Sequence, residues 1–506
     1  MHNIADTLTD ALSGDAGPAS RLVWWNCVEG NVATWQFDSE DGGPVSARSR
    51  KPEVSFDPWL RTRKGWAREF ASIVLDPLGF GWMLQDHAER TGKVRQRAMK
   101  KRDVEAMFAT VEAIISSLML AVLKPNSPPA IAVSLRSLKQ GMSRYDRPGY
   151  SNLGKVLEVF ASRPADAATG KGDVLGPWRL YKSRQRGTPS VVVAEPGFLI
   201  ENMRQHIRSG ALSLADFYRE PGSEPIILTR TERDASTFEK ASEWLDYTDT
   251  PTSRAFRAEM DRLNGALREA DVGFVEDGGP PVPVLRNELR RYFSQADGDS
   301  EATPTFDRGG RLFGGWWQDI GRERRWAIRI DGEPIADLDY SNMFMRLAYV
   351  EAGVVPPVGD LYARVSGFDG PNLRPAVKKL ANALFFRTTP MVRLPRDPEL
   401  KNALPPGVTG AAMREAILAA HPALASIFET GAGMRLMFQE SQILLAALFC
   451  MLDQGITALP MHDGVMVAKS RAAAAMQCMF EAADKIVGVR LPVVEKPVIS
   501  VGRSQN

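Results

Sequence analysis

Two aspartates lie where an apolar, strand-like stretch over residues 335–348 becomes helical. Asp337 and Asp339 are two positions apart, so the alternation of side chains along a β-strand would place both carboxylates on one face. Carboxylates that share a face can hold a divalent metal ion. The pair therefore indicates either a metal site or a strand end followed by the carboxylate cap of a helix at 342–352.

A third aspartate, Asp463, lies in the motif Met461-His462-Asp463-Gly464. Apolar, strand-like residues precede and follow this motif, so we expect it at the tip of a hairpin. A carboxylate at such a tip could face Asp339 across a small sheet. Two carboxylates from separate strands can hold a pair of Mg²⁺ ions that assist in-line displacement at phosphorus. A turn that only reverses the chain is the alternative interpretation.

A further set of residues combines positive charge with an aromatic ring. Arg374, Lys378 and Phe386 are spaced by helical turns, so they would lie along one face of a helix. Pro375 suits the first turn of that helix. Cations bind phosphates and a ring can lie against a base or sugar, so this stripe is typical of a nucleoside triphosphate site. A solvated basic helix face is the alternative.

These side chains need particular elements to position them. Residues 326–330 and 335–340 have strand patterns, and Asp331-Gly332 between them predicts a β-hairpin. Further toward the N-terminus, apolar residues recur at helical spacing over 107–123 and predict a buried helix.

The middle of the chain carries weaker signals. A helix over about 151–162 is followed by short strands around a basic turn, which favours either a winged-helix-like module or a plain α+β insert. Long amphipathic helices are expected at about 231–272 and 284–296, with a Gly/Pro-rich break between them.

Composition bounds the class of protein. A chain of 506 residues with 44% hydrophobic and 25% charged residues is long enough for roughly two to four globular domains. No apolar run is expected to span a membrane, and the N-terminus lacks the pattern of a secretory signal. The three cysteines are widely spaced and two lie in apolar helical patterns, so we expect reduced, buried cysteines in a cytoplasmic protein.

Basic residues are grouped although the net charge is only +2. One run lies at 90–102 and a second at 171–186. Such runs are usually solvated helix faces, but in a protein that holds a polyanion they would contact its phosphates.

Four motifs in order along residues 300–506 together resemble the single-subunit, family A nucleic-acid polymerases, the group that includes bacterial DNA polymerase I and the phage-type RNA polymerases. That family has an Asp/Thr-x-x-Gly-Arg motif, a motif A written Asp-Tyr-Ser, a motif B with Arg-x3-Lys and a later aromatic residue, and a His-Asp motif C. The matching residues are Asp307, Gly310 and Arg311; Asp339, Tyr340, Ser341 and Arg346; Arg374, Lys378 and Phe386; and His462 and Asp463.

The resemblance implies an α+β, right-hand polymerase fold with palm, fingers and thumb. The expected domains are a mainly helical N-terminal region, a possible winged-helix-like module, thumb-like helices, and a palm and fingers core, at 1–140, 141–225, 226–300 and 301–506.

It also implies roles for the site residues. Asp339, Asp463 and the carbonyl of Tyr340 would ligate two Mg²⁺ ions, for which Mn²⁺ would substitute, and Asp337 becomes secondary. Arg374 and Lys378 would bind the triphosphate and stabilise the leaving pyrophosphate. The other implied contacts are nucleotide binding by Tyr340, Phe344 and Phe386, and nucleic-acid binding by Arg311, Arg435, Gln439 and His462.

Three positions depart from the family. Phe344 stands where family DNA polymerases have glutamate, Phe386 where they have tyrosine, and Gly464 where a glutamate usually follows His-Asp. A bulky ring at Phe344 could exclude a 2′-hydroxyl, so deoxynucleotides are favoured as substrates.

The resulting hypothesis is a template-directed nucleotidyltransferase, a cytoplasmic DNA polymerase of phage or plasmid replication or repair, without proofreading because the chain has no exonuclease motifs. Its partners would be a DNA template and primer, nucleoside triphosphates and a replication partner bound through the N-terminal region, but no membrane. A single-subunit RNA polymerase or primase is one alternative. A non-catalytic nucleic-acid-binding replication protein is another.

Overall fold

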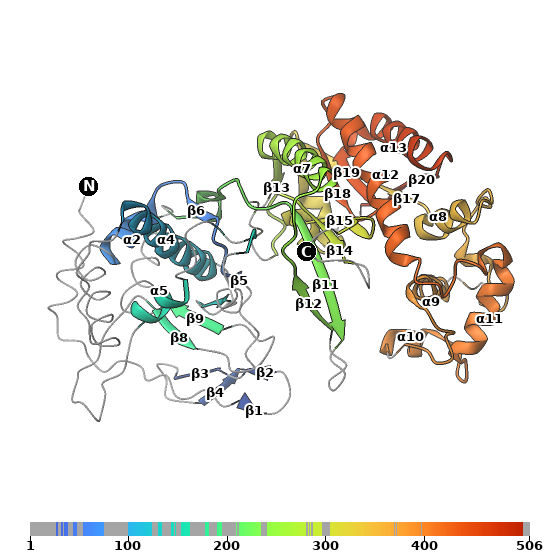
Figure 1. Cartoon of the computed structure of the whole chain (residues 1–506), viewed down its shortest axis with the longest axis horizontal. Coiled ribbons are helices and arrows are strands. Elements are labelled where there is room, and N and C mark those ends of the chain that lie inside the picture. The colour runs from blue at the N-terminus through green and yellow to red at the C-terminus, as the bar shows by residue number, and fades with distance from the viewer. Residues whose placement is uncertain are drawn as a thin grey trace, which may run out of the picture. The chain divides into compact units, whose positions relative to one another are not determined.

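The computed structural model describes most of the C-terminal half of the chain and parts of the N-terminal half. Besides a few short strands and single residues, the described ranges are 54–74, 100–123, 130–133, 153–161, 178–181, 190–194, 212–233, 240–279, 287–295, 304–368, 372–395 and 397–498. The chain divides into two compact units, unit 1 at Met1–Ser223 and unit 2 at Glu224–Asn506 (Figure 1). Both contain helices and sheets, so the predicted α+β class is confirmed.

Unit 1 packs helices against a four-stranded sheet. The helices are α2 (Trp66–Val74), α4 (Lys101–Leu123) and α5 (Leu153–Val159). The sheet has the order β5-β7-β9-β8, with β5 at Val54–Ser55, β7 at Ala130–Val133, β9 at Ser190–Ala194 and β8 at Trp178–Tyr181. The smaller pairs are β1 (Cys27–Val28) with β2 (Val32–Ala33), β3 (Trp35–Asp38) with β4 (Pro44–Ala47), and β6 (Leu60–Thr62) with β10 (Phe217–Arg219).

The predicted basic hairpin of unit 1 is present as β8 and β9, which pair antiparallel. However, β9 also pairs with β7, so the hairpin is part of a larger sheet. Strands therefore accompany the helices of the first 140 residues, which the sequence predicted to be mainly helical. The winged-helix-like assignment stays a prediction, and most of the basic runs at 90–102 and 171–186 lies outside the described residues.

The first sheet of unit 2 corrects a prediction. Its order is β12-β11-β14-β15, formed by β11 (Ile226–Arg233), β12 (Lys240–Trp244), β14 (Arg290–Ser294) and β15 (Gly309–Phe313). The helices expected at 231–272 and 284–296 are wrong except for α7 (Pro251–Glu269). Charged residues in these segments have good helix propensity, but pairing between distant strands, such as the parallel pair β11 and β14, overrides it. The thumb-like region at 226–300 thus combines one long helix, α7, with strands such as β11, β12 and β14 where it is described.

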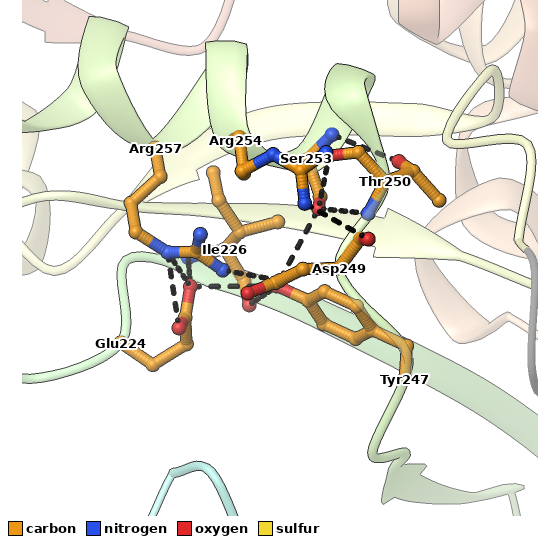
Figure 2. Close-up of polar contacts among 8 residues, drawn as sticks. All are labelled: Glu224, Ile226, Tyr247, Asp249, Thr250, Ser253, Arg254 and Arg257. Atoms are coloured by element: carbon orange, nitrogen blue, oxygen red, sulfur yellow. Dashed lines mark hydrogen bonds and ion pairs between the residues drawn. The ribbon is translucent and has the colours of Figure 1, made fainter.

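A polar network fixes the start of α7 (Figure 2). The Thr250 hydroxyl accepts a hydrogen bond from the Ser253 backbone N–H at 3.1 Å, and the Ser253 hydroxyl accepts one from the Thr250 N–H at 3.0 Å. These reciprocal bonds satisfy N–H groups that a helix start leaves without partners. Arg257 of α7 also holds the Glu224 carboxylate at 3.2 Å, which ties the helix to the residues before β11.

The second sheet of unit 2 carries the aspartates. Its order is β13-β16-β17-β19-β18, and β20 also pairs with β17; the strands are β13 (Val272–Phe274), β16 (Ile328–Ile330), β17 (Glu333–Tyr340), β18 (Ala458–Met461), β19 (Gly464–Ala468) and β20 (Val493–Lys496). Both predicted hairpins are confirmed, β16 with β17 and β18 with β19. Asp331 and Gly332 have positive φ angles of 51° and 75°, as a tight two-residue hairpin turn requires.

Further α-helices of unit 2 lie along the chain between these strands. They are α8 (Met343–Glu351), α9 (Arg374–Phe386), α10 (Pro398–Ala403), α11 (Gly410–Ala420), α12 (Gly433–Asp453) and α13 (Ala472–Val487). The helix predicted at 342–352 is confirmed as α8, and α9 begins with Pro375 in its first turn as predicted. Helix α12 packs against β15, α8, α9 and α13, so it joins the two sheets to the helices (Figure 1).

Among the described residues, α4 and α12 are long and apolar enough to cross a membrane, with mean hydropathies of 2.0 and 1.3. From the sequence we expected no apolar run that spans a membrane; these two helices meet the length and composition test, which buried core helices also meet. Both helices are packed in their units: Val111, Ile114 and Leu118 of α4 are fully buried, and α12 contacts elements on several sides. Burial inside the fold accounts for their apolar composition.

The cysteines of α12 and α13 also differ from expectation. Cys450 and Cys478 form a disulfide, with their Cα atoms 5.6 Å apart. The prediction of two separate, reduced cysteines was therefore wrong. It failed because a separation of 28 residues along the chain does not show how the two helices pack.

Candidate active site

A pocket of about 550 Å³ in unit 2 brings together most of the predicted site residues. Strands β15, β17 and β20, the turn between β18 and β19, helices α8 and α9, and the middle of α12 contribute to its wall. The predicted site residues in its lining are Arg311, Asp339, Tyr340, Phe344, Arg374, Lys378, Phe386, His462 and Asp463. Arg435 and Gln439 are not part of the lining.

Two carboxylates lie side by side in the lining of this pocket. Asp339 lies near the end of β17 and pairs directly with Gly464 of β19, so Asp463 is beside it at the tip of the next hairpin. Asp339 is buried, and this burial together with the negative charge of Asp463 raises the pKa of Asp339 to about 6. Adjacent carboxylates repel each other when both are ionised, so a cation between them would stabilise the ionised pair.

Gly464 makes this close approach possible. A Cβ atom at Gly464 would lie 2.5 Å from the Leu338 carbonyl oxygen and 2.8 Å from Asp339 Oδ1. Both distances are too short for non-bonded contact. Any larger residue at this position would therefore push the two strands apart, which explains why this chain has glycine after His-Asp.

A lysine from the last strand also reaches the aspartates. Lys496 Nζ lies 2.5 Å from Asp339 Oδ2, and Lys496 pairs with Asp337 across β20 and β17. Asp337 is buried and forms an ion pair with Arg325 at 3.6 Å, outside the pocket lining. Burial raises the pKa of Asp337, although Lys496 and Arg325 oppose this shift. Asp337 thus has partners of its own.

The donor set fits a divalent cation with few protein ligands. Asp339 and Asp463 offer carboxylate oxygens, and no cluster of three or more His, Cys, Asp or Glu side chains suited to a metal occurs in the part of the chain that the structure describes. Mg²⁺ in phosphoryl-transfer sites commonly keeps several waters and binds one or two carboxylates plus substrate phosphates. Two carboxylates in the lining of a pocket are compatible with that pattern, and the Tyr340 carbonyl stays a predicted ligand.

The basic stripe of α9 faces the same pocket. Arg374 forms an ion pair with Asp360, and its guanidinium lies 5.6 Å from the centre of the Tyr362 ring. Lys378 is exposed. Phe386, with 44% of its surface exposed, lies 5.9 Å from Phe344 between ring centres. Helix α9 therefore presents cations and an aromatic ring opposite the carboxylates.

An ion pair with a buried carboxylate joins β15 to α12 in the wall of the pocket. Arg311 of β15 donates to Glu440 of α12 at 2.6 and 3.1 Å, and its guanidinium lies 5.5 Å from the centre of the Phe344 ring. Glu440 is fully buried. Burial raises the pKa of Glu440 to about 7, against the effect of Arg311, and the charges of Asp463 and Asp339 add to the rise.

The remaining predicted residues are placed as follows. His462 contacts Phe313 edge-on at 5.7 Å, and desolvation together with Arg311 and Arg325 lowers its pKa. Arg435 forms an ion pair with Glu351 on α8. The other three are Gln439, whose Oε1 is buried without a hydrogen-bond partner among the described residues, Asp307, which accepts from the Thr305 hydroxyl, and Tyr340, whose hydroxyl donates to the Met479 carbonyl.

The hydroxyl of Tyr340 is therefore engaged with α13, although Tyr340 also contributes to the pocket lining. It is almost completely buried and reaches α13. The reason is the alternation along β17: Asp339 faces the pocket, so the next side chain faces the opposite side.

Sequence reasoning missed several pocket residues, namely Arg322, Tyr362, Asn382, Glu440 and Lys496. A signal existed for Glu440, because a carboxylate inside the long apolar pattern of α12 is unusual without a partner. No such signal existed for Lys496, since an exposed lysine near the end of a short strand is ordinary in any protein.

Comparisons with known proteins give likeness to solved structures but none to family models or curated sequences. No family model matches the sequence, and no curated protein matches it. Among solved structures, the chain is similar to the POL domain of Pol1 from M. smegmatis in complex with a DNA primer-template and dNTP, with a TM-score of 0.28 and 14% sequence identity. The likeness covers 48% of this chain and 51% of that one, so this chain spans about half of that chain's length.

Proposed function

We propose that this protein is a template-directed nucleotidyltransferase that extends a nucleic-acid strand by phosphoryl transfer. The observation that carries the proposal is the convergence of Asp339 and Asp463, from neighbouring strands, in one pocket with Arg374 and Lys378 of α9. Paired carboxylates opposite a pair of cations are suited to a metal-bound triphosphate. The order of the motifs and their resemblance to family A polymerases support the same reaction.

Each group has a distinct task in this proposal. Asp339 and Asp463 would hold Mg²⁺, which when bound supplies charge stabilisation for attack by a 3′-hydroxyl and departure of pyrophosphate. Lys378 is exposed in the pocket and would bind the phosphates, and Arg374 would join it by exchanging its Asp360 partner for a phosphate. The protein thus contributes position and electrostatics rather than a covalent intermediate.

We further propose deoxynucleotides as substrates. The Phe344 ring is buried against Phe385 and Phe386 and lies beside the Arg311 guanidinium. A ring packed in this way cannot easily move aside for a 2′-hydroxyl, so it would act as a wall against ribonucleotides. A single-subunit RNA polymerase or primase is the alternative, and it requires that a ribonucleotide with its 2′-hydroxyl fits beside the Phe344 ring.

The wider assignment follows from the same reaction. In it the second sheet of unit 2 is the palm, α9 belongs to the fingers, and unit 1 grips template or recruits a replication partner. The reaction would serve phage or plasmid replication or repair in the cytoplasm, without proofreading.

Primer extension tests the proposal directly. The full-length protein is incubated with a primed DNA template, Mg²⁺ and either dNTPs or NTPs, and we expect extension with dNTPs. Asp339→Asn and Asp463→Asn should each reduce the rate by at least about 100-fold, because each removes a metal ligand. Asp484→Asn, at an exposed aspartate of α13, is the matched control and should leave the rate unchanged.

The possible outcomes separate the alternatives. Incorporation of NTPs alone would replace the DNA polymerase by an RNA polymerase or primase. Undiminished Mg²⁺-dependent synthesis by Asp339→Asn would refute the active site. Tight DNA binding with no incorporation of either nucleotide would identify a non-catalytic replication protein.

A further inference from the structure

Lys496 is placed where a metal ion would be expected to act. Its Nζ lies 2.5 Å from Asp339 Oδ2. Because Lys496 and Asp337 are opposite each other in the antiparallel pair of β20 and β17, their side chains share a face with Asp339, two residues further along β17. The lysine side chain therefore extends diagonally from β20 to the carboxylate on β17 that lines the pocket.

The surrounding charges show why a cation is needed there. Four carboxylates lie close together in this part of unit 2: Asp337, Asp339, Glu440 and Asp463. Arg325 pairs with Asp337 and Arg311 pairs with Glu440. In the described part of the chain, the direct ion pair of Asp339 is with Lys496. Without this lysine, the Asp339 carboxylate would lie beside Asp463 with no direct ion pair of its own in the described part of the chain.

The two partners of this ion pair differ in their exposure to solvent. The side chain of Lys496 keeps 37% of its surface exposed, whereas that of Asp339 keeps 12%. A lysine with a partly solvated, flexible stem can leave such a site without disrupting the strands that carry it.

We propose that Lys496 is an internal counter-ion for the Asp339–Asp463 pair. In the free protein this lysine occupies the place of a divalent cation, and it is displaced when the cation binds. This inference rests on the proposed function, because it takes Asp339 and Asp463 as metal ligands. It makes metal binding an exchange of one cation for another. The free protein keeps a stable site, and the exchange lowers its affinity for metal.

The test measures metal affinity in the absence of nucleotide and nucleic acid. Mn²⁺ is titrated into the full-length protein and free Mn²⁺ is followed by electron paramagnetic resonance. Lys496→Met keeps most of the side-chain volume but removes the charge, so we expect it to bind Mn²⁺ on the order of tenfold more tightly than the wild type. Lys496→Gln should behave in the same way, and Lys496→Arg should remain close to the wild type.

The thermal unfolding temperature provides a second, independent test, because the expected change in EDTA is opposite in direction to the expected gain in metal affinity. In EDTA, Lys496→Met should unfold at a lower temperature than the wild type, because the two carboxylates lose their counter-ion. Saturating Mn²⁺ should raise the unfolding temperature of Lys496→Met by more than it raises that of the wild type. Lys469→Met is the matched control: Lys469 pairs with Glu495 near the same strand but outside the active-site pocket, and neither readout should change beyond a small loss of stability.

Two results would overturn the inference. The first would leave the proposed metal site in place, and the second would exclude it as well. If Lys496→Met and Lys496→Gln bind Mn²⁺ no more tightly than the wild type while Asp339→Asn abolishes binding, the lysine is no competitor but the metal site remains. If Asp339→Asn leaves Mn²⁺ binding unchanged, both the counter-ion and the proposed metal site are wrong.

Discussion

Glu440 is the carboxylate that is most completely enclosed near the pocket. Its side chain is fully buried, and both of its oxygens accept from Arg311, at 2.6 and 3.1 Å. Burial raises the pKa of Glu440 to about 7 from an ordinary value of 4.5. The pair holds the Arg311 guanidinium beside Phe344, so the ionisation of Glu440 is linked to the shape of the proposed sugar wall.

This shift predicts how stability depends on pH. The folded protein keeps the Glu440 proton at pH values where the unfolded chain has lost it, so the contribution of Glu440 to the free energy of unfolding falls as the pH rises from about 4.5 to about 7. The total fall corresponds to about 3 kcal/mol. Glu440→Gln should remove it.

Urea unfolding of wild type and Glu440→Gln at several pH values checks this prediction. The difference in unfolding free energy between the two proteins should shift in favour of the variant as the pH rises through this window. A difference that is constant with pH would show that Glu440 ionises in the folded protein as it does in the unfolded chain.

Gly464 allows a second prediction about a single residue. A Cβ at this position would lie 2.5 Å from the Leu338 carbonyl oxygen and 2.8 Å from Asp339 Oδ1, so Gly464→Ala must separate β17 from β19 or move Asp339. We expect a loss of about 1–3 kcal/mol in unfolding free energy, together with weaker Mn²⁺ binding. Gly273→Ala is the control, because a Cβ at this glycine of β13 would meet no atom within 4 Å. Similar losses in the two variants would contradict the steric explanation.

Among the elements, α8 and the loop after it are joined by one arginine. The buried Arg346 donates to the carbonyl oxygens of Ser341 at 2.9 Å, Pro357 at 3.0 Å and Gly359 at 2.8 Å. Ser341 lines the pocket, and Gly359 precedes the Asp360 that pairs with Arg374. Arg346 therefore connects the end of β17 to the partner of the α9 cation.

Removing this arginine should loosen the loop and destabilise unit 2. Arg346→Met leaves three backbone carbonyls without their donor, and we expect a loss of about 2–4 kcal/mol in unfolding free energy by urea denaturation. Arg364→Met removes one exposed bond to the Val358 carbonyl and should cost less than about 1 kcal/mol. Equal losses for the two variants would show that the loop does not depend on Arg346.

For the whole molecule, unit 2 contains every residue of the active-site pocket. It also contains both sheets that position the motifs and the network at the start of α7, which includes Glu224 (Figure 2). A fragment of residues 224–506 therefore keeps the proposed metal site and its supports.

We expect this fragment to fold by itself. It should unfold cooperatively in a circular dichroism melt and bind Mn²⁺ with the affinity of the full chain, because both of its sheets and the whole active-site pocket lie within residues 224–506. Its affinity for primed DNA, measured by fluorescence anisotropy, should fall, because unit 1 carries the basic runs at 90–102 and 171–186. A fragment without a cooperative transition would contradict the division into two units.

Features set by short stretches of sequence could be predicted from the sequence alone. The hairpin turn at Asp331-Gly332, the proline-led start of α9 and the hairpin around Asp463 all depend on local backbone preferences. The helices expected at 231–272 and 284–296 failed for the opposite reason, because strand pairing between distant segments outweighed local propensity.

What the sequence by itself determined is therefore the identity of the chemical groups and the local elements that carry them. Only the tertiary structure decided which groups meet: Asp339 with Lys496, Arg311 with Glu440, and Cys450 with Cys478. The physical reason is that each of these contacts joins residues far apart in the chain. Such contacts depend on how whole strands and helices pack, and the local spacing of residues carries no information about that packing.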